Sequence, residues 1–278
     1  MTADTHKPPA AAFEAIEAEA WAELQLGFPD DAKRALGIRV ERIDDGVLVI
    51  AGKTPVLALN HAVGLGFSAP LSAPRLDEIV KAYAAAGAER FAIAWSPDGE
   101  PRDMPAQFLA RGFALLSSWA KLWRSTALAL PAIEVDPALR TVEIGPEHGA
   151  AYECVVGEAL GVSCDLRHGI RSTLGQPNWH YYMTFDGDRP IAGGASFIRG
   201  EHAWFGLAAT QDGDRRRGAQ SALLARRIAD ARSDGCKWIS AETPAETEEK
   251  PNPSYHNMVR LGFELLYERP NFVLDLAK

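Results

Sequence analysis

The 278-residue chain has little of what marks several common protein classes. Its three cysteines, Cys154, Cys164 and Cys236, lack CxxC spacing, which fits a reducing compartment and gives no support for a zinc site. No run approaches the roughly 18 apolar residues of a membrane-spanning helix. The N-terminus lacks the charged lead and apolar run of a signal peptide. Because no His, Asp and Glu spacing suggests a ligand set either, we expect a cytoplasmic protein without a metal or a membrane partner.

Two common phosphate-binding fingerprints are also missing, since neither GxxxxGK[ST] nor GxGxxG occurs in the chain. Positive charge is in deficit, with 29 Lys and Arg against 37 Asp and Glu and a net charge of -8. Such an acidic chain is a poor candidate for nucleic-acid binding. A local basic cluster within it therefore needs a local explanation.

The length allows a substantial core and two domains. Residues after Pro9 are rich in Ala and Glu, with Phe13, Ile16 and Ala20 on one stripe, which predicts a short amphipathic helix within an N-terminal helical segment, 1–34. Prolines interrupt the stretch 128–139, so we place a domain boundary near residue 130.

A weak internal repeat relates the two sides of this boundary. Each side has a helix, a glycine, an apolar strand, a Pro-containing loop, a short helix, a Gly-Phe turn and a strand. Gly87 and Gly112 are 25 residues apart in the first copy, and Gly235 and Gly262 are 27 apart in the second. This pattern predicts a tandem duplication, with domains at 35–127 and 139–278.

The second half has the pattern of an α/β (α+β) fold. Tight turns at 186–188 and 199–201 favour antiparallel hairpins, and the later strands alternate with helices. We therefore expect a mixed, mostly antiparallel central sheet flanked by helices. The predicted helices are 148–160, 221–235 and 254–260, and the predicted strands are 180–185, 191–198, 203–209, 237–242 and 263–274.

Three consecutive arginines, Arg215, Arg216 and Arg217, precede Gly218 and the predicted helix that carries Leu224 and Ile228. The helix dipole disfavours cations there by about 0.3–1 kcal/mol each. One interpretation is a solvated turn. The other is that a diphosphate binds the unpaired N–H groups of the helix start and the arginines, which would make the cluster favourable. The strand that leads into the loop and the helix that leaves it favour the second interpretation.

On these residues the chain resembles the GNAT-type N-acetyltransferases, which transfer acetyl from acetyl-coenzyme A to amines. That superfamily carries [QR]-x-x-G-x-[GA] between its fourth strand and a long helix, and residues 215–220 match its first four positions. Gln220 stands where a small residue is usual. The resemblance covers about 140–278, and more weakly 40–125 as a degenerate copy, and it implies the GNAT fold in two tandem domains.

The resemblance also implies a coenzyme A site. The strand with residues 207–209 would diverge from its neighbour, and its backbone groups would face the pantetheine and the thioester carbonyl. The small side chains of Ala208 and Ala209 equally suit tight packing of a helix on the sheet. The implied cofactor-binding residues are Leu207, Ala208, Ala209, Arg215, Arg216, Arg217, Gly218, Ala219, Gln220, Ser221, Asn252, Ser254 and Asn257.

The first copy lacks the arginine-glycine loop. The corresponding stretch, 68–74, contains Pro70 and Pro74, which remove N–H donors, and only Arg75 is basic nearby. We infer that this half does not hold coenzyme A and instead shapes the acceptor site or a homodimer interface.

Attack by an amine needs a base, since a free alkylamine has a pKa around 10.4. We favour Glu242 as the base, because it ends the predicted strand 237–242, next to the strand that would contact the cofactor. A surface carboxylate or a helix cap would give the same sequence pattern. Met258 stands at the position where the superfamily often has a tyrosine that acts as general acid. Tyr255, nearly one turn earlier, is therefore the candidate acid, although it equally suits a core aromatic. Glu246, Glu248 and Glu249 suit a solvated lid, and Asn252 or Ser254 also suits a helix cap.

The leading hypothesis is a cytoplasmic N-acetyltransferase that uses acetyl-coenzyme A, direct attack and no metal, with a small-molecule or peptide amine as acceptor. The alternatives are a non-catalytic acyl-coenzyme A sensor or interaction module and a regulatory domain that binds sugar phosphates. The sequence identifies neither the acceptor nor the oligomeric state.

Overall fold

The computed structural model describes residues 9–162, 167 and 169–276, which form two compact units. The N-terminal unit comprises Pro9–Ala120 together with the end of the chain from Tyr267, and the C-terminal unit comprises Lys121–Leu266. Within these described ranges no helix is both long enough and apolar enough to cross a membrane.

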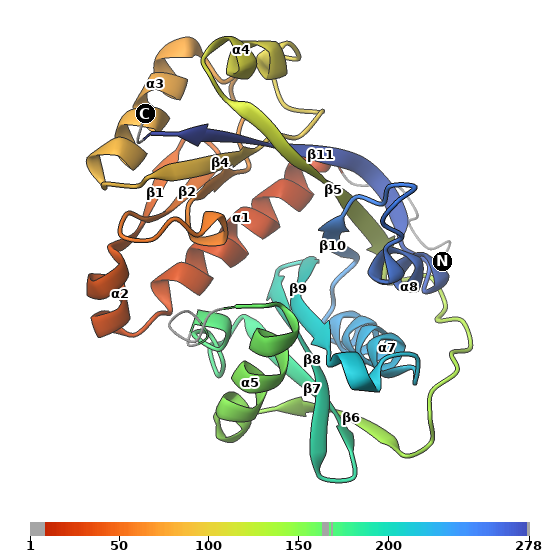
Figure 1. The fold of residues 1–278 in the computed structure, drawn as a ribbon. Helices are drawn as coiled ribbons and strands as arrows, with labels where there is room; N and C mark the ends of the chain where they lie inside the picture. The colour runs from red at the N-terminus through yellow and green to blue at the C-terminus, as the bar shows by residue number, and fades with distance from the viewer. Residues whose placement is uncertain (1–8, 163–166, 168, 277–278) are drawn as a thin grey trace. The chain divides into compact units, whose positions relative to one another are not determined.

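The C-terminal unit is built on a mixed sheet with the strand order β5-β10-β9-β8-β7-β6 (Figure 1). β9 and β10 pair in parallel, while β6 to β9 form an antiparallel meander. The predicted fold class is confirmed. The elements are β5 (Ala114–Ser125), β6 (Leu139–Ile144), α5 (Gly149–Ala159), β7 (Trp179–Asp186), β8 (Arg189–Arg199), β9 (His202–Thr210), α7 (Ala219–Ser233), β10 (Trp238–Pro244), α8 (Pro253–Arg260) and β11 (Glu264–Asp275), with 3-10 turns at Pro146–His148 and Asp212–Asp214.

Local sequence sets these elements within about two residues of the predicted ends. Gly187 and Gly200 both adopt φ of 60° at the hairpin turns, a backbone conformation that disfavours side chains. The apolar stripe of α7 packs onto the meander, where Leu223 joins Tyr182 and Ile191 in one buried cluster.

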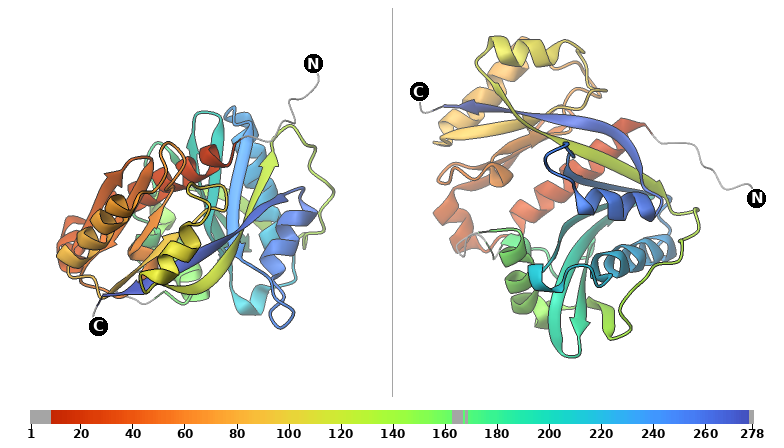
Figure 2. Two further views of the ribbon diagram at one scale, coloured as in Figure 1. Left: turned by 90° about the horizontal axis from the view of Figure 1, so that it is seen from above. Right: turned by 45° about the vertical axis from the view of Figure 1, so that its right-hand side comes forward.

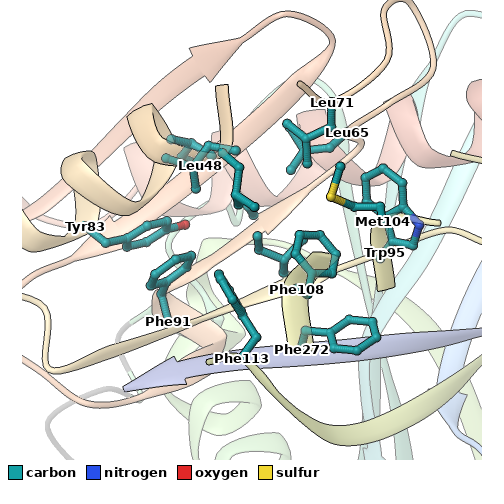
Figure 3. Close-up of a cluster of buried hydrophobic side chains, with 14 of the residues drawn as sticks. Leu48, Leu65, Leu71, Tyr83, Phe91, Trp95, Met104, Phe108, Phe113 and Phe272 are labelled. Carbon is teal, nitrogen blue, oxygen red and sulfur yellow. The ribbon is translucent and has the colours of Figure 1, made fainter. Parts of the chain in front are cut away.

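The strands of the N-terminal unit follow one another in the order β1-β2-β3-β4-β11. Only β3 and β4 pair in parallel among these strands. A cluster of buried aromatic and aliphatic side chains, including Tyr83, Phe91, Trp95 and Phe108, fills its core (Figure 3). Its elements are α1 (Ala10–Leu26), α2 (Asp30–Leu36), β1 (Ile38–Ile43), β2 (Gly46–Ala51), η1 (Leu57–Leu59), β3 (His61–Val63), α3 (Ala73–Ala85), β4 (Arg90–Ala94) and α4 (Met104–Ala110).

The two halves repeat the same helix endings. Gly87, Gly112, Gly235 and Gly262 all have φ between 80° and 85°. After each glycine, the next N–H bonds to a carbonyl five residues back, as in Ala88 N to Tyr83 O (3.1 Å) and Cys236 N to Ala231 O (2.9 Å). This is the Schellman arrangement, which requires a left-handed residue at the helix end. The spacing of glycines that suggests the duplication therefore has a shared physical cause.

The last strand of the chain completes the N-terminal unit rather than the half that precedes it. Asn271–Asp275 of β11 pairs antiparallel with β4, from Asn271↔Ala94 to Asp275↔Arg90 (Figure 2). Conversely, the end of β5 belongs to the C-terminal unit, where Thr126 N donates to Lys237 O at 3.0 Å. Strand pattern alone does not reveal this exchange, and the division of the sequence at 35–127 and 139–278 stays a prediction about the repeat.

Helix α1 is buried on more than the predicted stripe. Phe13, Ile16 and Ala20 are buried as expected, but Glu14 and Glu17 are only 1% exposed. Both carboxylates pair with Arg269 of β11, at 2.9 and 2.7 Å. The helix therefore carries two buried acids that an amphipathic pattern would place in water.

Candidate functional site

The parallel pairing of β9 and β10 ends halfway along both strands. Their register runs from Trp238↔His202 to Ala241↔Phe205, whereas β9 continues to Thr210 and β10 to Pro244. In the described part of the chain, the backbone of 206–210 has no further partner on the β10 side. A strand that has no partner along one edge can bind an extended ligand through main-chain hydrogen bonds.

A bulge lies in the part of β9 that has no partner on the β10 side. Between the pairs Ala195↔Gly206 and Gly193↔Ala209, β9 has two residues where β8 has one. Leu207 adopts φ of 49°, which is uncommon for a non-glycine residue. Its carbonyl accepts a hydrogen bond of 2.6 Å from the buried Tyr152 hydroxyl. Because a bulge redirects the backbone, the predicted cofactor strand 207–209 departs from regular strand geometry at its first residue.

The loop after β9 ends at Gly218, which has φ of 85°. A Cβ there would lie 2.4 Å from Glu134 O and 2.8 Å from Val135 Cα. The missing side chain of Gly218 therefore admits the chain's own segment at this point. Gly218 is thus needed both for its backbone conformation and for contact with residues 134–135.

Several N–H groups at the start of α7 are unpaired. Within the ranges that the structure describes, the N–H groups of residues 216–221 have no acceptor, and the first bonded one is Ala222 N, to Gly218 O at 2.9 Å. Their number exceeds the usual four at a helix start because the loop before the helix contributes as well. Such a row of donors is the physical basis of anion binding at helix N-termini.

The three arginines of the loop differ in their surroundings. Arg217 pairs with Asp136 and Asp186, both at 2.7 Å, and with Asp214 at 3.2 Å. Arg215 is exposed and pairs with Asp212 at 2.6 Å. These aspartates therefore compensate much of the positive charge of the loop. The sequence alone suggested that a bound ligand would have to do so. Among the described residues Arg216 has no carboxylate partner, and it is exposed, which leaves it available to a phosphate.

Helix α8 begins at a cap that ties it to β10. The Asn252 side chain accepts from Ser254 N (3.0 Å) and Tyr255 N (3.3 Å), and it donates to Thr243 Oγ1 (2.9 Å) and Pro244 O. Of the two predicted caps, Asn252 is therefore the one observed. Glu246 accepts from Asn252 N at 2.7 Å and pairs with His256 at 2.8 Å, so it supports this helix start.

The candidate acid and base lie on these two elements. Glu242 is half-buried in β10, directly after the last residue that pairs with β9. Tyr255 is half-buried in the first turn of α8, whereas Met258 is 6% exposed and points to the core. The Gln220 side chain lies 3.5 Å from Thr210 Oγ1, at the end of β9. Ser254 contributes its N–H to the cap, and Asn257 accepts from Arg260.

Neither described cysteine suits a covalent acyl carrier. Cys236 is 3% exposed, and burial raises the pKa of its thiol to about 11. A hydrogen bond to Glu158 raises the pKa of the Cys154 thiol, which lies on the outside of α5. Cys164 lies outside the described residues. In the described part of the chain, no three His, Cys, Asp or Glu residues are grouped as metal ligands.

In the corresponding loop of the N-terminal unit, a carboxylate of the chain itself binds the backbone N–H groups. Asp45 Oδ2 accepts from Phe67 N and Ser68 N, both at 2.7 Å, before α3. The loop after β4 bonds to the same segment, through Glu100 N to Gly66 O at 2.8 Å, and Trp95 packs against Gly66. A carboxylate thus takes the place of an external anion. This arrangement supports the inference that the first copy holds no coenzyme A.

Sequence reasoning missed the side chains that support the loop and the bulge. The partners Asp212 and Asp214 had a local signal, because each stands three residues before the arginine it pairs with. Asp136, Asp186 and Tyr152 had none, since they meet the loop and the bulge only in the folded chain.

No family model and no curated protein matches the sequence. Solved structures do match the fold over nearly the whole chain. A GCN5-related N-acetyltransferase from Kribbella flavida is 15% identical, with a TM-score of 0.66 and 96% of each chain covered. One from Sphaerobacter thermophilus is 15% identical, with a TM-score of 0.60, 98% of this chain and 97% of that chain covered. A functionally unknown conserved protein from Staphylococcus epidermidis is 7% identical, with a TM-score of 0.59, 90% of this chain and 99% of that chain covered. At these identities the likeness establishes the architecture, and this chain has the fold of the GCN5-related N-acetyltransferases.

Proposed function

We propose that the C-terminal unit binds acetyl-coenzyme A and transfers its acetyl group to a primary amine of a small molecule or peptide. The observation that carries the proposal is the combination of parted strands β9 and β10 with the row of free N–H groups at residues 216–221. The unpaired edge of β9 suits an extended arm, and the helix start suits a diphosphate. The fold that the named N-acetyltransferases share supports the same assignment.

The chain's own residues would then divide the chemistry. The amine nitrogen attacks the thioester carbonyl, Glu242 takes the proton that the nitrogen loses, and the C–S bond breaks. The thiolate accepts a proton, for which Tyr255 is the candidate donor. Direct attack fits the two described cysteines, since one is buried and both have raised pKa values.

A panel of primary amines with acetyl-coenzyme A, read out by thiol release, tests the proposal. We expect steady release with at least one amine class, abolished when the substrate amine is already acetylated. Binding of acetyl-coenzyme A without release across the panel would instead support the second candidate, a non-catalytic acyl-coenzyme A sensor. The observation that favours this candidate is Met258, buried where the superfamily carries its tyrosine.

A further inference from the structure

Helix α7 buries a cation in its apolar stripe. Arg227 is 1% exposed, between Leu224 and Ile228, and among the described residues no carboxylate pairs with it. Burial lowers the pKa of its guanidinium to about 10. A well-packed apolar side chain at such a position is often neutral or stabilising relative to a buried charge. Burial of apolar surface alone therefore does not explain why an arginine stands here.

The guanidinium is held against the strands that bear the bulge. Arg227 Nη2 donates to Ala195 O at 2.6 Å, and Nε lies 3.3 Å from Ser196 Oγ, both on β8. The guanidinium carbon lies 4.3 Å from the centre of the Phe205 ring on β9, a cation–π contact. These contacts replace a counter-ion with dipoles and a ring, so the positive charge is solvated but not neutralised.

Two consecutive glycines of β8 leave room for side chains on opposite faces of the sheet. A Cβ on Gly194 would lie 2.9 Å from Arg227 Nη1 and 3.1 Å from Ala208 Cβ. A Cβ on Gly193 would lie 2.8 Å from the Tyr152 ring, whose hydroxyl holds Leu207 O. Helices α7 and α5 lie on opposite faces of these strands (Figure 1), so Arg227 contacts β8 and Phe205 beside the bulge from one face, and Tyr152 bonds to Leu207 O of the bulge from the other.

We propose that Arg227 is a positioning residue for acetyl transfer, which fixes the bulge of β9 and sets an uncompensated positive charge behind it. The inference rests on the proposed function. Negative charge develops on the carbonyl oxygen as the amine attacks and on the sulfur as the C–S bond breaks. A fixed cation within a poorly solvated wall stabilises such charge without reorganising during the reaction.

Replacing Arg227 with an uncharged side chain of similar length separates this role from packing. We expect Arg227→Met to remain cooperatively folded, which urea unfolding checks, with kcat lowered at least about tenfold and KM for acetyl-coenzyme A within about threefold. Arg227→Lys, which keeps the charge, should recover part of kcat. Arg226→Met is the matched control, because the Arg226 side chain, next in sequence, is partly exposed and pairs with Asp230 on the same helix.

Wild-type kcat in Arg227→Met, or equal losses in the Met and Lys variants, would overturn the inference while the proposed function stands. A wild type that binds acetyl-coenzyme A but acetylates no amine would overturn the proposed function, and this inference with it. If Arg227→Met does not fold, Arg227→Gln keeps a donor for Ala195 O without the charge. Its kcat must then fall below that of Arg227→Lys.

Discussion

Individual residues at the candidate site differ in how far sequence alone identifies them. Gly218 is identified by its motif, yet the physical reason for it includes the segment 134–135, which no local pattern reveals. Asn252 is identified as one of two possible caps, and the structure selects it. The sequence does not indicate a functional role for Arg227 or Tyr152, because each is a single polar side chain on an otherwise apolar helix face.

The roles of Glu242 and Tyr255 remain predictions that kinetics can check. If Glu242 is the general base, Glu242→Gln should lower kcat by about 10² to 10⁴. Tyr255→Phe should have a smaller effect, about tenfold, because a thiol with a pKa near 8.5 leaves without much assistance. Glu248→Gln, in the exposed loop after β10, is the control for Glu242. A Glu242→Gln enzyme within about threefold of wild type would exclude the base assignment.

Among the elements, helices and strands of the C-terminal unit follow closely from sequence. The hairpins at Gly187 and Gly200, the stripe of α7 and the Schellman ends come from local chemistry. The bulge at Leu207 does not, because the one extra residue of β9 depends on the register with β8. The charge balance of the loop before α7 likewise depends on strands far away in the sequence.

The start of α8 should lose stability when its cap is removed. Asn252→Ala leaves two helix N–H groups and Thr243 Oγ1 without the partner they have here, and we expect a loss of about 1–2 kcal/mol in the free energy of unfolding. Urea unfolding measures it, with Ser254→Ala as the control at the neighbouring position. Equal stabilities of the two variants would show that the cap contributes little.

The loop before α7 should make the C-terminal unit sensitive to acid. Arg217 lowers the pKa of Asp186, Arg189 lowers that of Asp214, and the Ala138 N–H with Arg217 lowers that of Asp136. A carboxyl group whose pKa is lowered by folding stabilises the fold at any pH above its ordinary pKa, near 3.8. It loses that contribution as the pH falls below this value. We therefore expect the urea midpoint to drop between about pH 5 and pH 3, less steeply in Asp136→Asn. An unchanged slope in that variant would contradict the assignment.

On the scale of the whole molecule, the sequence predicts the repeated architecture but not the exchange of last strands. A strand of twelve residues has the same alternation of apolar and polar side chains whichever strands it pairs with. The sequences of β5 and β11 therefore do not indicate their partners. The ion group of Glu14, Glu17 and Arg269 belongs to the same problem, because it joins residues near the two ends of the chain within one unit.

Arg269→Met should destabilise the N-terminal unit strongly. It would leave two carboxylates that are 1% exposed without their cation, and breaking a buried pair in this way costs about 3–5 kcal/mol. Arg90→Met is the control, because its ion pair with Asp275 also ties an element of this unit to β11 but is partly exposed, and it should cost about 1 kcal/mol or less. Similar urea midpoints for the two variants would contradict the importance of the buried group.

Isothermal titration with acetyl-coenzyme A shows whether the C-terminal unit holds a diphosphate at the start of α7. Arg216→Glu reverses an exposed charge at this helix start, and Arg232→Glu reverses an exposed charge at the other end of the same helix. We expect the wild type and Arg232→Glu to bind alike, and Arg216→Glu to bind about tenfold more weakly. No binding by the wild type, or equal affinity in all three proteins, would contradict the account.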